Sequence, residues 1–197
     1  MTLKRLAGYF CRLSQLTGEK IAEISSSQLA KMMDTNSSQL RQDFHHFGGF
    51  GKPGHPYDVS LLKEEFHKIF GVEEPVNIVL VGATAIAQAL LENSTLSLLN
   101  IKIAGIVDEN PENIGKKYNG SEILNTKKLA KIISKHNVKI GAVCTAEPEK
   151  SMQLLIDHGL KAIWNLTPIY IRQPEGVVIR HENLAAGLLT LIYKMNQ

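Results

Sequence analysis

The hydrophobic pattern of the chain changes at residues 71–75, and this change constrains the fold more than any other feature. Before it, apolar residues recur three and four positions apart, which is the spacing of amphipathic helices. After Pro75, short apolar runs alternate with helical segments, which is typical of a parallel sheet with crossover helices. We therefore predict a helical domain over residues 1–74, an α/β domain over residues 75–182 and a separate helix within residues 183–197.

The first domain has the order of elements of a winged helix-turn-helix. The apolar spacing predicts a helix over residues 3–16, and the run Ser25–Ser27 offers an N-cap for a short second helix. A third helix opens at Ser37. The segment GGFGKPGHPY that follows contains four glycines and two prolines, so it predicts a hairpin or exposed loop, which would be the wing.

The second domain reads as a Rossmann-like, doubly wound parallel sheet. Apolar runs predict strands, and the segments between them predict helices. The expected strands are 76–81, 101–107, 140–143, 162–164 and 177–179, and the expected helices are 85–92, 126–135 and 148–157. A last helix, 183–195, has one broad apolar face. That face either covers the sheet of its own chain or contacts a second copy, and the pattern leaves both open.

Composition is that of a soluble globular protein, with 44% apolar and 21% charged residues. Residues 1–56 hold seven basic and four acidic side chains, whereas the remainder holds 15 of each. A basic first domain suggests a polyanionic partner, the alternative being a solvated basic surface. Cys11 and Cys144 are the only cysteines, so neither a disulfide framework nor a metal site is expected. No signal peptide or membrane span is apparent, and we expect a cytoplasmic protein.

The third helix predicts a surface that contacts DNA. If Leu40, Phe44 and Phe47 face the core, the opposite face is rich in hydrogen-bond donors. Arginine suits guanine in the major groove and glutamine suits adenine, whereas other polar groups hold phosphates. An ordinary surface helix is the alternative. The predicted DNA contacts are Ser38, Arg41, Gln42 and His45 on this helix, Lys52 in the wing, and Lys4, Arg5, Ser26, Ser27 and Lys31 as phosphate contacts.

A dinucleotide site is predicted where the first strand of the second domain ends. The segment Gly82-Ala83-Thr84-Ala85-Ile86-Ala87 stands where such a fold places G-x-G-x-x-G/A. Gly82 permits the tight turn and Ala87 is an accepted third position. Thr84 replaces the second glycine, whose absent side chain normally lets the backbone approach the pyrophosphate. Asp108 ends the second strand, where an acid binds the ribose of NAD; a capping or turn role is the alternative.

The chain resembles the Rex family of redox-sensing repressors over nearly its whole length. The resemblance rests on LKRL, SSSQLA, SSQLRQDFHHFGGFGKPGHPYDV, LVGATAIAQAL, VDENPENIG, GLKAIWNLTP and PEGVVIRHENLA, in this order. It implies a homodimer that binds an inverted-repeat operator, binds NAD(H), exchanges its last helix between subunits and leaves DNA when NADH binds. Against the family pattern, Gln42 replaces a basic residue, Cys144 a proline near the nucleotide site, and Asn183 an aspartate. Asn93 and Thr95 replace aromatic residues.

Two other functions remain open from the sequence. Thr84 favours a paralogue that keeps the fold and DNA binding but has weakened or lost its response to NADH. A small NAD-dependent oxidoreductase could share the strand–glycine–helix unit. No proton-transfer residue can be placed opposite a nicotinamide, however, and 197 residues leave little room for a substrate domain. We therefore expect a regulator and not an enzyme.

Overall fold

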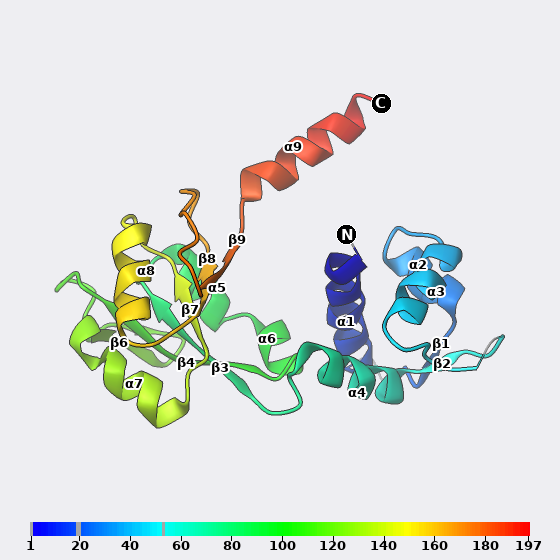
Figure 1. Ribbon diagram of the computed structural model, residues 1–197, viewed down its shortest axis with the longest axis horizontal. Helices are drawn as coiled ribbons and strands as arrows, with labels where there is room; N and C mark the ends of the chain where they lie inside the picture. Colours follow the sequence, from blue (N-terminus) through cyan, green and yellow to red (C-terminus); the bar gives the residue numbers. More distant parts are fainter. Residues whose placement is uncertain (1, 19–20, 53) are drawn as a thin grey trace. The chain divides into compact units, whose positions relative to one another are not determined.

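The computed structural model describes residues 2–18, 21–52 and 54–197 (Figure 1). Contacts divide the chain into two compact units, residues 1–75 with 94–101 and residues 76–93 with 102–197. The first unit is helical apart from a two-stranded ribbon, and the second contains a seven-stranded sheet. The predicted change from a helical unit to an α/β unit is confirmed. The inclusion of residues 94–101 in the helical unit was not foreseen.

The helices of the first unit begin at polar caps. Its helices are α1 (Thr2–Gly18), α2 (Ser26–Met32), α3 (Ser37–His46), α4 (Val59–Phe70) and α6 (Ser94–Leu98), and strand β1 (Glu23–Ile24) pairs antiparallel with β2 (Tyr57–Asp58). Ser25 caps α2 as predicted, its hydroxyl accepting from Gln28 N. Asn36 caps α3 by accepting from Gln39 N. These caps satisfy backbone donors that the first turn of a helix leaves free.

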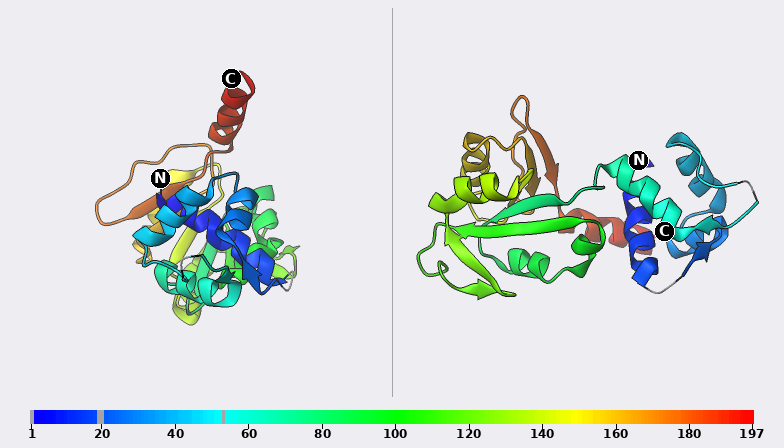
Figure 2. Two further views of the ribbon diagram at one scale, coloured as in Figure 1. Left: turned by 90° about the vertical axis from the view of Figure 1, so that its right-hand side faces the viewer. Right: turned by 90° about the horizontal axis from the view of Figure 1, so that it is seen from below.

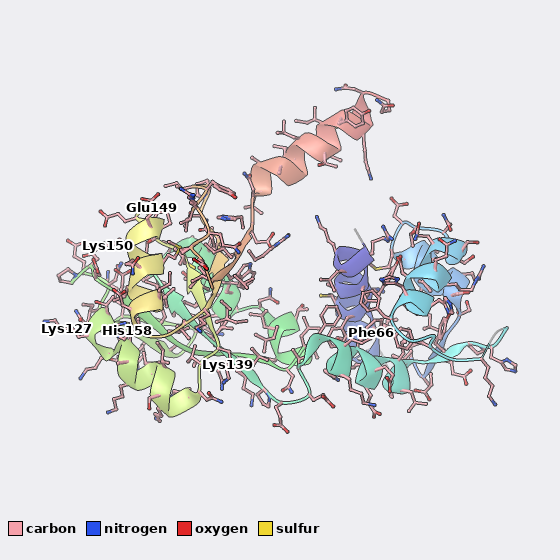
Figure 3. The ribbon with its side chains drawn as sticks, in the orientation of Figure 1. Phe66, Lys127, Lys139, Glu149, Lys150 and His158 are labelled. Atoms are coloured by element: carbon pink, nitrogen blue, oxygen red, sulfur yellow. The ribbon has the colours of Figure 1, made fainter. Side chains whose placement is uncertain are left out.

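Aromatic side chains form the centre of the first unit. Phe66 of α4, labelled in Figure 3, is fully buried. Its ring centroid lies 5.7 Å from those of Phe10 and Phe44 and 5.5 Å from that of Phe50. Phe44 and Leu40 therefore face the core, as predicted.

Two expectations about buried positions are corrected. Phe47 is only half-buried because it is the C-cap of α3 rather than part of its inward stripe. The apolar spacing over residues 58–70 predicts a helix with Leu61, Leu62, Phe66 and Ile69 buried, but Leu61 is 61% exposed and Ile69 is only half-buried. Val59, Leu62 and Phe66 form the inward face of α4, at helical spacing, and Leu61 lies off that face.

The sheet of the second unit has the strand order β5-β6-β4-β3-β7-β8-β9. The strands are β3 (Val76–Val81), β4 (Ile101–Asp108), β5 (Lys117–Tyr118), β6 (Ser121–Asn125), β7 (Ile140–Val143), β8 (Ala162–Asn165) and β9 (Val178–His181). β3 pairs parallel with β7, β7 with β8 and β8 with β9, whereas β5 is antiparallel to β6. The five predicted strands are confirmed. β5 and β6 were missed because neither has a continuous apolar run.

Helices cover both faces of the sheet, as a doubly wound fold requires. Figure 2 shows α7 (Leu129–His136) and α8 (Pro148–Asp157) on one face and α5 (Ala85–Leu91) on the other. A short 3-10 helix, Thr126–Lys128, leads into α7. α8 packs closely on β7, since a Cβ added at Gly141 would lie 2.5 Å from Leu155 Cδ1. The crossovers diverge beside β3, so its carboxyl end opens into a crevice suited to a ligand.

The last helix, α9 (Leu184–Met195), follows β9 and buries none of its side chains. Leu184 is 84% exposed, and Leu188 and Leu191 are each more than half exposed. Of the two roles left open by the sequence, covering the sheet of its own chain is therefore not what the structure shows. Within the described residues, no helix combines the length and apolarity needed to span a membrane.

Candidate nucleic-acid interface and nucleotide site

The outward face of α3 presents the four side chains predicted from helical spacing. Ser38, Arg41, Gln42 and His45 are all exposed. Arg41 Nη1 donates to Ser26 Oγ at 3.1 Å, and Nη2 donates to Ser38 Oγ at 3.4 Å. The serine hydroxyls of α2 and α3 therefore hold the guanidinium, leaving its remaining donors available. A braced guanidinium loses less side-chain entropy when it binds a base edge.

A cavity of about 490 Å³ lies between α2, α3 and the wing. Ser26 of α2, Arg41 and His45 of α3, and Lys52 of the wing all contribute to its lining. The wing needs its glycines, because Gly49 and Gly51 have positive φ angles of 69° and 74°. Of the two predicted forms, its described residues take the exposed loop and not the hairpin, because the two-stranded ribbon of this unit pairs β1 with β2.

The remaining predicted DNA contacts fall into two groups. Lys4, Ser27 and Lys31 are exposed, so a phosphate could reach their side chains. Arg5 is different: its Nε and Nη2 donate to Asp43 Oδ2 and Oδ1 at 2.7 and 2.6 Å. Two of its three guanidinium nitrogens therefore bind a carboxylate of α3. The phosphate contact predicted for Arg5 stays a prediction.

Asp43 of α3 is a buried carboxylate that the sequence pattern did not predict. Its side chain is 2% exposed and also accepts from Tyr9 Oη at 3.0 Å and Gln39 Nε2 at 3.1 Å. The guanidinium of Arg5, with these hydrogen bonds, lowers the pKa of Asp43 although burial opposes it. A signal did exist: Asp43 lies three positions after Leu40 and next to Phe44, on the buried stripe, where a charge requires a partner.

Gly82 lies at the end of β3 in the tight turn expected of a dinucleotide fold. Its φ is +104°, and an added Cβ would lie 2.6 Å from Thr145 Cγ2 and 2.9 Å from the carbonyl carbon of Cys144. Glycine is therefore required both by conformation and by space. The turn is fixed further because Gly82 N donates to Val107 O at 2.8 Å.

Thr84 is the N-cap residue of α5, but its side chain makes no capping hydrogen bond. Its Oγ1 is buried and has no partner among the described residues. The hydroxyl thus does not point into solvent, where a phosphate would meet it. Of the other predicted loop residues, Ala85 and Ile86 are exposed, and Ala83 and Ala87 are buried.

Asp108 ties the glycine turn to the loop after β4. Its Oδ2 accepts from Ala83 N at 2.7 Å and Asn113 Nδ2 at 3.1 Å, and its Oδ1 accepts from Asn110 N at 2.8 Å. Burial would raise the pKa of Asp108, but these hydrogen bonds lower it below its usual value. A hydrogen bond from the Glu109 backbone amide lowers this pKa as well, so the carboxylate has the turn role given above as the alternative. A ribose contact by Asp108 stays a prediction.

A cavity of about 300 Å³ lies beside this turn. Gly82, Asp108, Glu109 and Thr145 contribute to its lining, and so does Lys150 of α8, which is labelled in Figure 3. Lys150 Nζ donates to Glu109 Oε2 at 2.5 Å and lies 3.6 Å from Glu147 Oε2. Sequence reasoning did not find this ion pair, since its partners are 41 positions apart.

Cys144, predicted at the nucleotide site, supports the glycine turn through its backbone. Cys144 N donates to Val81 O at 2.8 Å, whereas the side chain is buried. Burial raises the pKa of the Cys144 thiol to about 12, so it stays protonated at neutral pH. Among the described residues, no group of three His, Cys, Asp or Glu side chains is arranged to hold a metal ion.

Comparisons with known proteins agree on one family. Redox-sensing transcriptional repressors named Rex, from Clostridium botulinum strain Hall and Clostridioides difficile strain 630, are each 35% identical to this chain. Each alignment covers 99% of the chain and 94% of the relative. The chain belongs to the Rex family of redox-sensing transcriptional repressors.

Solved structures of a Rex-family repressor, RSP, have the same fold. The RSP structure itself is 29% identical with a TM-score of 0.79, covering 99% of this chain and 93% of that one. RSP in complex with β-NADH is 28% identical over 99% and 92% of the two chains, and RSP with β-NAD+ and operator DNA is 30% identical over 99% and 91%. Both have a TM-score of 0.81.

Two family models match successive parts of this Rex-family chain. Residues 1–45 match "Putative DNA-binding protein N-terminus", and residues 73–169 match "CoA binding domain". The first match includes α3 up to His45, and the second includes Gly82 and Asp108. The winged-helix and Rossmann-like assignments therefore rest on separate comparisons. The individual contacts assigned to Arg41, Gln42 and Asp108 remain predictions.

Proposed function

We propose that this Rex-family chain is a homodimeric repressor that binds an inverted-repeat operator and releases it when NADH binds. Residues 1–74 would bind DNA, residues 75–182 would bind NAD(H), and residues 183–197 would join the subunits. The observation that carries the proposal is α3, which buries Leu40 and Phe44 while exposing Arg41 and Gln42 beside the wing. The RSP complexes with NADH, and with NAD+ and operator DNA, support the two ligands by analogy.

The DNA-binding role rests on the arrangement of α3 and the wing. Arg41 and Gln42 would contact base edges, with Ser38 and His45 beside them on bases or phosphates. Lys52 would contact phosphate or the adjacent minor groove. Lys4, Ser26, Ser27 and Lys31 would hold phosphates. Two copies of α3 reach successive major grooves when they are about 34 Å apart.

The dimer is supported by the apolar surface of α9. Leu184, Leu188 and Leu191 of α9 are exposed to water in a single chain. Burial of each leucine side chain against a partner would stabilise the assembly by roughly 1.5–3 kcal/mol. A twofold exchange of α9 between subunits would cover both copies at once.

The residues at the carboxyl end of β3 fit a dinucleotide. Gly82 forms the tight turn at the edge of the cavity, the crevice lies where crossovers diverge, and Asp108 lines the same cavity at the position that binds a ribose in such folds. Its negative charge disfavours a 2′-phosphate and so favours NAD(H) over NADP(H). The ligand would act here as a signal, and we assign no enzymatic activity. We place the repressor in the cytoplasm, where its DNA and NADH occur together.

Two measurements test the separate ligands. Selection from random duplexes should enrich an inverted repeat. Isothermal titration calorimetry should show binding of NADH and much weaker binding of NADPH. No enrichment of any sequence would refute the DNA-binding role.

A paralogue with a weakened response to NADH is the second candidate. It is favoured by one observation: Thr84 Oγ1 is buried without a partner where the family of dinucleotide folds has a glycine. Calorimetry with a Thr84→Gly variant separates the two. A parent that binds NADH as tightly as the variant supports sensing, whereas a parent that binds only after the change supports the paralogue.

A further inference from the structure

The recognition helix α3 carries an anion on its buried side. Asp43 follows Arg41 and Gln42 directly, yet its carboxylate points inward and accepts four hydrogen bonds. Three of them come from α1, through Arg5 and Tyr9, and the fourth comes from Gln39 one turn earlier on α3. The ring of Tyr9 also packs edge-on against Phe44 at 5.7 Å.

This arrangement fixes the helix more closely than apolar packing can. A buried ion pair adds little stability over well-packed apolar groups, because desolvation offsets the attraction. Its hydrogen bonds are directional, however, and a guanidinium fork accepts a carboxylate in only a narrow range of orientations. Rotation or sliding of α3 against α1 would break those hydrogen bonds, and the same movement would displace Arg41 and Gln42 from the bases.

We infer that Arg5, Tyr9 and Asp43 are positioning residues that hold the recognition helix in register for base contacts. This inference rests on the proposed DNA-binding function. Arg5 then acts on sequence specificity without touching DNA. A phosphate contact by Arg5 is the competing role, and the two differ in measurable ways.

The test compares Arg5→Gln and Asp43→Asn with the parent, as full-length chains at a temperature where circular dichroism shows each to be folded. Affinity is measured for the selected operator and for a mixed-sequence duplex of equal length, at several salt concentrations. We expect at least a tenfold loss of operator affinity and a change within about twofold for the mixed duplex. The slope of log K against log salt should stay unchanged, since no phosphate contact is removed.

Lys4→Ala is the matched control on the same helix, because Lys4 is exposed and adjacent to Arg5. It should weaken both duplexes alike and reduce the salt slope by about one. The double variant Arg5→Gln/Asp43→Asn should lose no more than either single variant, since both changes break one unit. Tyr9→Phe keeps the ring packing and removes only the hydroxyl. It should bind the operator several-fold more weakly and the mixed duplex unchanged, and it replaces the charge variants in the test if either of them fails to fold.

An unchanged ratio of operator to mixed-sequence affinity in these variants would overturn the inference. So would a reduction of about one in the salt slope for Arg5→Gln, which would return Arg5 to the phosphate contacts. A parent that prefers no sequence would instead refute the proposed function itself, so the two failures are distinguishable.

Discussion

The guanidinium of Arg41 donates to two serine hydroxyls, which orient it toward a base edge. We predict that Arg41→Ala weakens operator binding by about 1–3 kcal/mol and relaxes the preference at one base position. Fluorescence anisotropy with the selected operator and its single-base variants measures both effects. Lys31→Ala is the control, since loss of a phosphate contact weakens all sequences alike. Equal operator affinity of Arg41→Ala and the parent would remove Arg41 from the base contacts.

Substitution of Gly82 can separate the cost of a left-handed backbone conformation from the cost of a steric clash. Gly82→Ala should lower the free energy of unfolding by more than Gly115→Ala does. Both positions have positive φ, but a Cβ at Gly115 meets nothing within 4 Å. The left-handed conformation alone costs roughly 1–2 kcal/mol, and contact with the Cys144 carbonyl group and the Thr145 methyl group adds to that cost at Gly82. Urea unfolding measures the difference, and equal losses would show that the turn can relax.

Asp43 should give the stability of the first unit a defined acid dependence. Its pKa is lowered in the folded protein, so the native state binds fewer protons than the unfolded state, in which the pKa is about 3.9. The stabilisation is therefore complete above about pH 4 and is lost as pH falls through the folded pKa. The free energy of unfolding of the parent should exceed that of Asp43→Asn by about 1–3 kcal/mol at pH 6. This difference should be smaller at pH 3. A difference independent of pH would contradict the lowered pKa.

Residues on a regular pattern could be predicted from the sequence, and residues whose role depends on a distant partner could not. Helical spacing placed Ser38, Arg41, Gln42 and His45 on one face. The same spacing could not show that Arg5 would meet Asp43, 38 positions away. Nor could the glycine motif show that Asp108 would hold the amide of Ala83. Such pairs are created by the packing of elements, which a linear pattern does not contain.

At the scale of elements, α9 carries the main prediction. The pair of changes Leu188→Glu and Leu191→Glu should convert a dimer to a monomer, because charges cannot be buried between subunits without partners. Size-exclusion chromatography with light scattering measures the mass. Lys194→Glu, an exposed polar position on the same helix, is the control and should remain dimeric. A double variant that keeps the mass of a dimer would place the subunit interface elsewhere.

Elements were predicted well where the apolar pattern is strong, either as a continuous run in a strand or at helical spacing. β3, β7 and α8 begin and end where their patterns predicted. β6 contains only Ile123 and Leu124 as apolar residues, and its strand conformation comes from parallel pairing with β4. α6 has five residues and no buried side chain of its own, so it has too little pattern to be recognised.

At the scale of the whole molecule, the proposal requires two dimer states with different spacings of the α3 helices. The factor by which NADH lowers operator affinity cannot exceed the ratio of its affinities for the two dimer states, of which only one fits DNA. The coupling must be reciprocal, so bound operator should weaken NADH binding by the same factor by which NADH weakens operator binding. Calorimetric titration of NADH with and without operator measures this factor, and unequal factors would show that a further species takes part.

The most direct measurement is an anisotropy titration of the protein–operator complex with NADH, at fixed salt and with NAD+ in parallel. We predict that NADH dissociates the complex, whereas NAD+ leaves it intact. A specific complex that persists at saturating NADH would contradict redox sensing, and the absence of any specific complex would contradict the account as a whole.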